Sequence, residues 1–245
     1  FIMDMLGKSF QPSPIPVTQE QTVAIVGSGP TGLTAAQDLA EAGYEVHLYE
    51  MTDRLGGMAI WGIPAFRLPV DTINEDIDRI LHYCPGIKVH LNCALGRDVS
   101  LDELKKRHDA LMLAIGAWWG KKMNLPGEDD PKVMDGVTFL REVNEGARPT
   151  MPETVVVVGA GDVSMDACRV AKRLPGCKTV KVVYRRGPNE IPARCDELEG
   201  AIKEGVEFIY MAQPIEIIRQ EEELILRCIK TELGEPEEDG RRQPL

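Results

Sequence analysis

The stretches TVAIVGSGPTGLTAAQDLAEAG at residues 22–43 and TVVVVGAGDVSMDACRVAKRL at residues 154–174 decide the fold of this chain. In each stretch a short apolar run leads into a glycine-rich turn, and apolar residues at helical spacing follow. The apolar run is typical of a buried strand in a parallel sheet, and the later spacing is typical of an amphipathic helix. The two stretches therefore predict two strand–turn–helix units in an α/β protein.

The spacing of small residues in each turn indicates a site for a nucleotide pyrophosphate. A pyrophosphate binds the unpaired N–H groups at a helix N-terminus, provided that no Cβ atom stands in its way. The three small residues allow the tight turn, the close approach of the phosphate and the packing of helix on strand. They are Gly27, Gly29 and Gly32 in the first turn, and Gly159, Gly161 and Ser164 in the second. A tight turn without a ligand is the alternative interpretation of each.

The strand predicted after the first helix, residues 44–50, ends in a carboxylate. Glu50 lies 21 residues beyond Gly29, where an acidic side chain accepts hydrogen bonds from a ribose with a free 2′-hydroxyl. The first half is therefore predicted to bind FAD or NAD. A solvated glutamate at a strand end is the alternative.

The corresponding strand of the second half, residues 179–184, is followed by Arg185 and Arg186. Paired guanidiniums bind a 2′-phosphate bidentately, whereas a carboxylate would repel it. The second half is therefore predicted to bind NADP, with Arg194 as a further contact from the next loop. Ordinary surface charge is the alternative interpretation.

Further motifs carry a resemblance to a known family. They are RLGGM at 54–58, WGIPAFRLP at 61–69, DALMLAIGA at 109–117, LPGED at 125–129, VVYRR at 182–186 and ELGEP at 232–236. From about residue 22 to its end, the chain resembles the small (β) subunit of glutamate synthase. It is also similar to the flavin half of dihydropyrimidine dehydrogenase and to the large subunit of NADH-dependent ferredoxin:NADP oxidoreductase. The motifs are specific for this superfamily and do not choose among its members.

The resemblance implies two Rossmann-like three-layer dinucleotide-binding domains, one for FAD and one for NAD(P). It places the FAD phosphates and ribose on Gly29, Pro30, Thr31, Gly32 and Glu50, with Leu55, Gly57 and Arg67 along the flavin. It places the pyrophosphate of NADP(H) on Gly161, Asp162 and Val163, and the 2′-phosphate on Arg185 and Arg186.

Departures from the family pattern predict that both ends are truncated. The chain opens at Phe1 rather than at a methionine, whereas members begin with a cysteine-rich iron–sulfur domain. Members also return to the FAD domain through a second Ala-x-Gly segment and a Gly-Asp, and Leu245 comes too early for these. We therefore expect an incomplete FAD site and a gene that extends past Leu245.

The expected organisation is a linker, two domains and a connector. The linker covers residues 1–20, the FAD-binding domain 21–118, the connector 119–152 and the incomplete NAD(P)-binding domain 153–245. Inside these, we expect helices near 70–83, 101–106 and 137–144, strands at 87–91 and 110–115, and a hairpin of 215–218 with 224–229.

Composition excludes several classes of function. A net charge of −11 argues against a nucleic-acid partner, and no apolar run approaches the length that spans a membrane. None of the six cysteines forms a C-x-x-C pair, so we expect reduced thiols in the cytoplasm and no metal or cluster site within the chain. The four histidines are scattered in the sequence, and none is predicted to be a ligand or a base.

These features favour an FAD-dependent NADPH oxidoreductase module of a larger hetero-oligomer. It would pass electrons between NADPH and iron–sulfur clusters, which lie in a missing N-terminal domain or in a partner that carries the acceptor enzyme. Because hydride transfer needs positioning more than an acid or a base, no catalytic residue is predicted. The alternatives are ferredoxin-to-NADP or bifurcating electron transfer, a non-catalytic nucleotide-binding subunit, and a structural scaffold without ligand.

Overall fold

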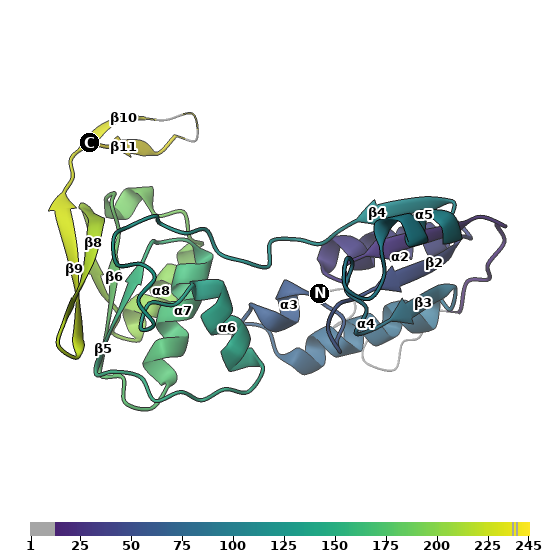
Figure 1. Cartoon of the computed structure of the whole chain (residues 1–245), viewed down its shortest axis with the longest axis horizontal. Coiled ribbons are helices and arrows are strands. Elements are labelled where there is room, and N and C mark those ends of the chain that lie inside the picture. The colour runs from purple at the N-terminus through teal and green to yellow at the C-terminus, as the bar shows by residue number, and fades with distance from the viewer. Residues whose placement is uncertain (1–12, 237, 239) are drawn as a thin grey trace. The chain divides into compact units, whose positions relative to one another are not determined.

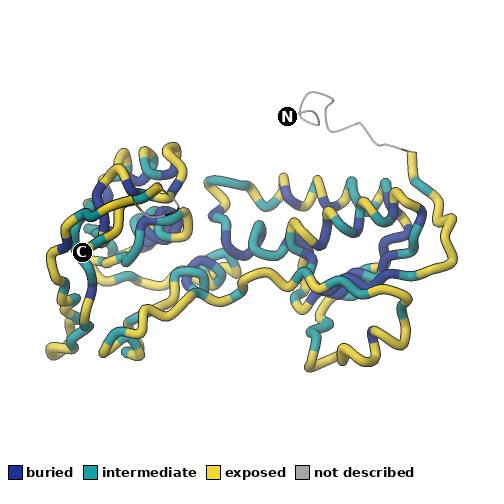
Figure 2. Tube along the Cα trace, turned by 90° about the horizontal axis from the view of Figure 1, so that it is seen from above, coloured by how far each residue is buried: buried dark blue, intermediate teal, exposed yellow. Residues whose placement is uncertain are grey.

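The computed structural model describes residues 13–236, 238 and 240–245, so most of the linker predicted at 1–20 lies outside the described residues. Its internal contacts divide the chain into two compact units, Phe1–Trp118 and Trp119–Leu245. Each unit contains one glycine turn and its own buried core (Figure 2). The connector predicted at 119–152 belongs to the second unit.

The first unit is built on a parallel sheet whose strands lie in the order β3-β2-β1-β4 (Figure 1). The strands are β1 (Thr22–Val26), β2 (Glu45–Tyr49), β3 (Ile87–His90) and β4 (Ala110–Leu113). The helices are α2 (Pro30–Glu41), α3 (Met58–Trp61), α4 (Val70–Tyr83) and α5 (Leu101–Arg107). Parallel order with helical crossovers is the arrangement that the first apolar run predicts.

Alternation along β1 sends side chains into two separate cores. Val23 and Ile25 pack in one cluster with residues of α2 and α4. Ala24 and Val26 pack in another cluster with Leu104 of α5. The unit therefore has helices on both faces of its sheet, which confirms the three-layer α/β class.

The second unit has a three-stranded parallel sheet in the order β5-β6-β7. The strands are β5 (Thr154–Val158), β6 (Thr179–Val183) and β7 (Glu207–Ile209). The helices are α6 (Gly136–Asn144), α7 (Asp162–Arg173), the short 3-10 helix η1 (Pro188–Glu190) and α8 (Cys195–Lys203). Residues of α6, α7 and α8 share one buried cluster with β6.

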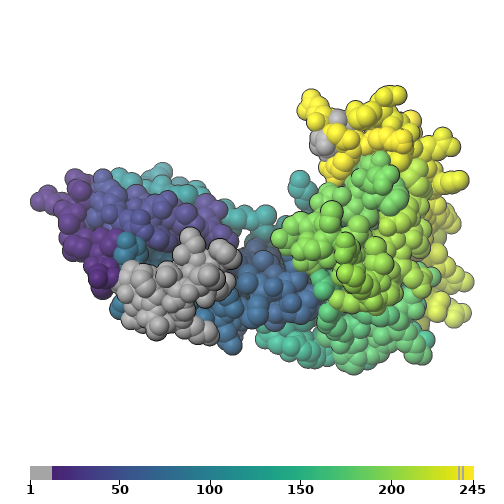
Figure 3. Space-filling view, turned by 180° about the vertical axis from the view of Figure 1, so that it is seen from behind, coloured from purple at the N-terminus to yellow at the C-terminus, as the bar shows by residue number. Residues whose placement is uncertain are grey.

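Two antiparallel pairs complete the second unit. The pair β8 (Ala212–Gln220) and β9 (Glu223–Lys230) confirms the predicted hairpin and is longer than predicted. The pair β10 (Leu233–Pro236) and β11 (Arg242–Pro244) forms the tail, which lies at one end of the unit (Figure 3). In the part of the chain that the structure describes, no helix is long and apolar enough to cross a lipid bilayer.

The first glycine turn is closed by direct backbone contact. Gly27 has φ of +102°, and a Cβ added at Gly32 would lie 1.9 Å from the Gly27 carbonyl oxygen. Only glycine therefore lets α2 begin so close to β1.

We expect Gly32→Ala to destabilise the first unit by about 1–3 kcal/mol, because the added methyl forces helix and turn apart. Denaturant unfolding measures this loss. Gly161→Ala is the matched control, since a Cβ at Gly161 meets nothing within 4 Å. Equal stability of the Gly32→Ala variant and the unmodified chain would contradict this packing.

Candidate dinucleotide-binding sites

Helix α2 begins directly after the first glycine turn and has no side-chain cap. Its N-cap residue is Gly29, and the first helical residue is Pro30, which has no N–H group. The N–H groups of Thr31 and Gly32 come next, where a helix has no internal acceptor for them. A Cβ added at Gly29 would find one atom at the 4 Å limit, the Cα of Gly57. The space over this helix end is therefore open to an anion.

Helix α7 begins in the same way in the second unit. Its N-cap residue is Gly161, again without a side-chain cap, and a Cβ added there meets nothing within 4 Å. By contrast, Ser100 caps α5 and Asp135 caps α6 through their side chains. Both glycine turns thus leave helix N–H groups to be satisfied from outside the helix, and both fit a pyrophosphate.

Glu50, which the sequence predicts as the acceptor of the first site, lies immediately after β2 and beside β1. Its side chain is 4 % exposed. Oε2 accepts hydrogen bonds from Ser28 N at 3.0 Å and Ser28 Oγ at 2.5 Å. Oε1 accepts from Thr52 N and Thr52 Oγ1, both at 2.9 Å. Four donors therefore orient this carboxylate at the rim of the first turn.

The loop after β2 lies against the first glycine turn. Gly57 has φ of +53°, and a Cβ on it would lie 2.6 Å from the Cα of Gly29. Leu55 is buried in the main core of the unit, so its side chain packs there. Arg67 is half-buried and its N–H donates to the Pro64 carbonyl at 2.8 Å. Of the three residues predicted along the flavin, Gly57 is thus the one that meets the turn directly.

The two arginines after β6 have different environments. Arg185 is exposed, and its carbonyl accepts a hydrogen bond from Thr231 Oγ1 at 2.7 Å. Arg186 is 3 % exposed, and its Nε donates to the Arg242 carbonyl of β11 at 2.7 Å. Arg185 therefore offers its guanidinium at the strand end, while Arg186 ties the tail to the sheet.

Arg194 lies over the start of α7. Its backbone N–H donates to Asp162 Oδ1 at 3.0 Å, and its Nε lies 3.9 Å from Asp162 Oδ2. The Asp162 carboxylate would repel a phosphate, so the Arg194 guanidinium offsets a negative charge at this helix end. Val163 is exposed at the next position of α7. Of the residues predicted for the second site, Asp162, Val163, Arg185 and Arg194 are exposed and Gly161 has open space beside it, whereas Gly159 is half-buried and Arg186 is buried.

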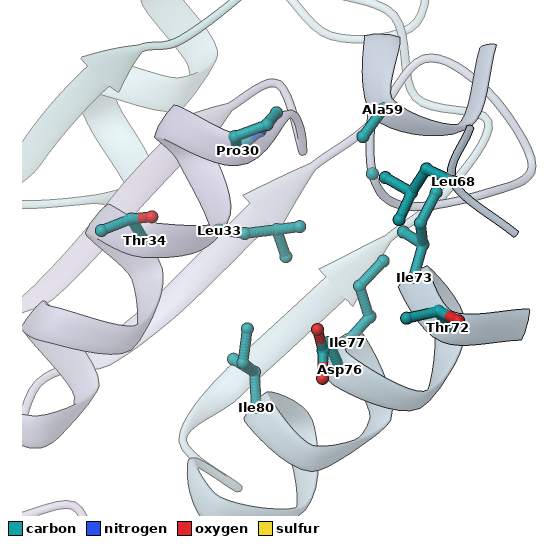
Figure 4. A pocket seen from close by; sticks show the side chains of 11 residues that line it. Pro30, Leu33, Thr34, Ala59, Leu68, Thr72, Ile73, Asp76, Ile77 and Ile80 are labelled. Carbon is teal, nitrogen blue, oxygen red and sulfur yellow. The ribbon is translucent and has the colours of Figure 1, made fainter. Parts of the chain in front are cut away.

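A groove on the first unit lies between α2 and α4 and has a volume of about 260 Å³; Figure 4 shows the side chains that line it. Pro30 and Leu33 of α2 face Ile73, Ile77 and Ile80 of α4 across it. The carboxylate in its lining, Asp76, is bonded to Arg79 at 2.5 Å. With an apolar lining and no cationic side chain in it, this groove is unsuited to a phosphate.

Three histidines that are scattered in the sequence come together on the first sheet. His47 and His90 stack with ring centroids 5.2 Å apart and share a hydrogen bond of 3.0 Å. His108 bonds Tyr49 Oη at 3.0 Å through Nε2. Burial lowers the pKa of both His90 and His108, and the charge of the neighbouring His47 lowers them further. Parallel pairing of β2 with β3 brings His47 near His90, and His108 joins them from the end of α5, so no local pattern indicates the cluster.

The cysteines have the character expected of reduced thiols. All six are free. Burial raises the pKa of Cys168 to about 12, so this thiol is unreactive at neutral pH. Among the described residues, no group of three histidine, cysteine or acidic side chains is arranged to hold a metal ion.

A family model described as "Pyridine nucleotide-disulphide oxidoreductase" matches residues 21–238. The chain is 38% identical over 233 residues to the NADP(+)-dependent formate dehydrogenase subunit beta of Moorella thermoacetica, covering 94% of this chain and 32% of that one. It is 39% identical to the NADPH-Fe(3+) oxidoreductase subunit beta of Geobacter sulfurreducens, covering 96% of this chain and 35% of that one.

A putative glutamate synthase [NADPH] small chain of Cereibacter sphaeroides is 34% identical, over 92% of this chain and 56% of the relative. These matches confirm the resemblance found in the sequence, and the chain spans only about a third to just over half of each relative. Among solved structures, FprA of Mycobacterium tuberculosis in complex with NADPH has a TM-score of 0.80 at 22% identity, covering 93% of this chain and 67% of that one. This similarity confirms the fold.

The histidine cluster predicts a dependence of stability on pH. The folded chain holds His90 and His108 with lowered pKa values, so the unfolded chain binds more protons as the pH falls below about 6.5. The contribution of the two histidines to the free energy of unfolding should be fully present above this pH. It should decline as the pH falls from there to the lowered pKa values of the folded chain. The charges of His47 and Arg107 oppose protonation of both His90 and His108, while Asp109 favours protonation of His108. Glu45 is hydrogen-bonded to His47.

Urea unfolding at a series of pH values between 7.5 and 5 measures this decline. His90→Gln should flatten it. His82→Gln, on the exposed side of α4, is the control and should leave it unchanged. The same slope in the His90→Gln variant and in the unmodified chain would remove the cluster as its cause.

Proposed function

Since the chain belongs to the pyridine nucleotide-disulphide oxidoreductase family, we propose that it is an NADPH-dependent flavin oxidoreductase module. The first unit binds FAD and the second binds NADPH, and electrons pass between NADPH and the iron–sulfur clusters of a larger complex. One observation carries the proposal. Each unit has a helix N-terminus without a side-chain cap, and a charged residue follows the neighbouring strand: the negative Glu50 in the first unit and the positive Arg185 in the second.

In the first unit, backbone and side chain divide the recognition of FAD. The N–H groups of Thr31 and Gly32 bind the pyrophosphate at the positive end of α2. Glu50 accepts from the adenosine ribose. The buried Glu50 carboxylate also excludes a nucleotide with a 2′-phosphate, because two negative charges would meet in a poorly hydrated place.

In the second unit, the same division selects NADPH. The N–H groups of Asp162 and Val163 bind the pyrophosphate, and Arg194 offsets the Asp162 charge beside it. Arg185 binds the 2′-phosphate from the end of β6. Thr231 Oγ1 donates a 2.7 Å hydrogen bond to the Arg185 carbonyl, which fixes the backbone from which the Arg185 side chain extends.

When bound, FAD would supply the chemistry that takes one hydride, with its two electrons, from NADPH and passes the electrons on one at a time, as iron–sulfur clusters require. The residues of this chain contribute position and electrostatics. Hydride transfer depends on distance and alignment and needs no acid or base from the protein. The two helix ends and the two strand ends contribute by positioning the two nucleotides.

The names of the relatives and the spacing of the cysteines support a proposal about partners. The relatives are named as a beta subunit of a formate dehydrogenase, a beta subunit of an Fe(3+) oxidoreductase and a small chain of glutamate synthase. None of the six cysteines here forms a C-x-x-C pair. We therefore place the clusters in another domain or subunit of a cytoplasmic hetero-oligomer, whose partner carries the acceptor.

Replacing Arg185 with alanine tests the nucleotide preference. Hydrogen bonds to charged groups contribute about 1.5–3 kcal/mol, so NADPH should bind roughly 10- to 100-fold more weakly, while NADH binding should not change. Titration calorimetry with each nucleotide measures the ratio. Arg186 is left intact, because its replacement would release β11 as well.

Arg227→Ala is the matched control. Arg227 lies on β9 of the same unit, is mostly exposed and pairs with Glu216 at 2.9 Å. It should bind both nucleotides normally. An NADPH-to-NADH ratio in the Arg185→Ala variant equal to that of the control would exclude Arg185 from the site.

A further inference from the structure

Ser28 lies in the first glycine turn, between Gly27 and Gly29. The G-x-G-x-x-G pattern does not specify the residue type at this position. Ser28 is 0 % exposed. Its Oγ lies 2.5 Å from Glu50 Oε2, to which its backbone N–H donates as well. The same hydroxyl accepts from the Gly56 N–H at 3.3 Å. Ser28 thus holds one oxygen of the Glu50 carboxylate from the buried side.

Thr52 holds the other oxygen from the opposite side. Its N–H and its hydroxyl both donate to Glu50 Oε1 at 2.9 Å. Thr52 is partly exposed, whereas Ser28 is buried. A ribose therefore reaches the carboxylate from the Thr52 side, at Oε1.

The two hydroxyls differ in whether they can give up their hydrogen bond to Glu50. The single proton of Thr52 Oγ1 has two acceptors, Glu50 Oε1 at 2.9 Å and the Arg54 carbonyl at 2.8 Å. It can turn to Arg54 without losing a hydrogen bond. Among the described residues, Ser28 Oγ donates to Glu50 and accepts from Gly56, so its hydroxyl keeps donating to Oε2.

Building on the proposed function, we propose that Ser28 and Thr52 set the selectivity of the FAD site for ribose over 2′-deoxyribose. Ser28 is a positioning residue that keeps Glu50 Oε1 facing the nucleotide. Thr52 is a replaceable donor that satisfies Oε1 until a ribose hydroxyl takes its place.

The energetics make opposite predictions for the two residues. Leaving a buried acceptor unsatisfied is costly, and the cost is greater for a charged group. Without the Thr52 hydroxyl, Oε1 keeps one donor, and a ribose hydroxyl restores the second while a deoxyribose cannot. Selectivity for ribose should then rise. Without the Ser28 hydroxyl, Oε2 keeps only one donor from the described part of the chain, the Ser28 N–H, so the carboxylate is held less firmly and selectivity should fall.

The test measures the dissociation constants of FAD and of its 2′-deoxyadenosine analogue, from flavin fluorescence, for the full chain freed of flavin. The selectivity is the ratio of the two constants, and tenfold corresponds to about 1.4 kcal/mol. We expect at least tenfold for the unmodified chain. Ser28→Ala should lower the ratio at least threefold, and Thr52→Val should keep it or raise it.

Two further variants serve as a control and as a substitute for Ser28→Ala. Thr22→Val removes a part-buried hydroxyl of the same unit at the far end of β1, where Thr22 bonds His108, and should leave the ratio unchanged. Ser28→Cys keeps the shape with a weaker donor and should give an intermediate ratio, which serves if the alanine variant fails to fold. An unchanged ratio in the Ser28 variants, or a fall in Thr52→Val, overturns the proposal.

Glu50→Gln separates this proposal from the function on which it rests. If the Gln variant binds FAD as tightly as the unmodified chain, and the unmodified chain does not discriminate, then Glu50 does not hold the ribose and the proposed FAD site itself fails. If Glu50→Gln weakens FAD binding but Ser28→Ala keeps full selectivity, only the roles of Ser28 and Thr52 fail.

Discussion

The starts of α2 and α7 are the constraint on which the rest of the structure depends. Each helix begins at a glycine that offers no side chain to the first N–H groups. Those groups have no acceptor within the helix and must find one outside it. In the proposed function an anion supplies it, and the strand that precedes each helix holds the turn at the carboxyl edge of a parallel sheet. The fold thus produces the same kind of uncapped helix end twice.

What distinguishes the two sites is the residue at the end of the neighbouring strand. Parallel pairing of β1 with β2 brings Glu50 beside Gly27, whereas pairing of β5 with β6 brings Tyr184 beside Gly159 and Arg185 one residue further on. In the proposed function, a carboxylate after β2 and a guanidinium after β6 give opposite selectivity for a 2′-phosphate. One architecture can therefore hold two dinucleotides without exchanging them, as a hydride transfer between them requires.

Much of this was predictable because it depends on local patterns. The strand–turn–helix units, α4 and the β8–β9 hairpin follow from periodicity and turn residues over short stretches. Partners separated by long stretches of sequence were not predictable. Arg186 looks like a second phosphate ligand in the sequence, yet a strand that begins at Arg242 buries it. The histidine cluster and the bonds of Ser28 to Glu50 likewise depend on sheet register, which no single stretch encodes.

The central claim is that NADPH bound to one unit reduces a flavin bound to the other. It is tested most directly by the absorbance spectrum of the natural complex, recorded without oxygen before and after NADPH or NADH is added. We expect flavin bands that bleach with NADPH and persist with NADH. A colourless complex, or flavin bands that ignore NADPH, would contradict it and leave the two glycine turns without a redox role.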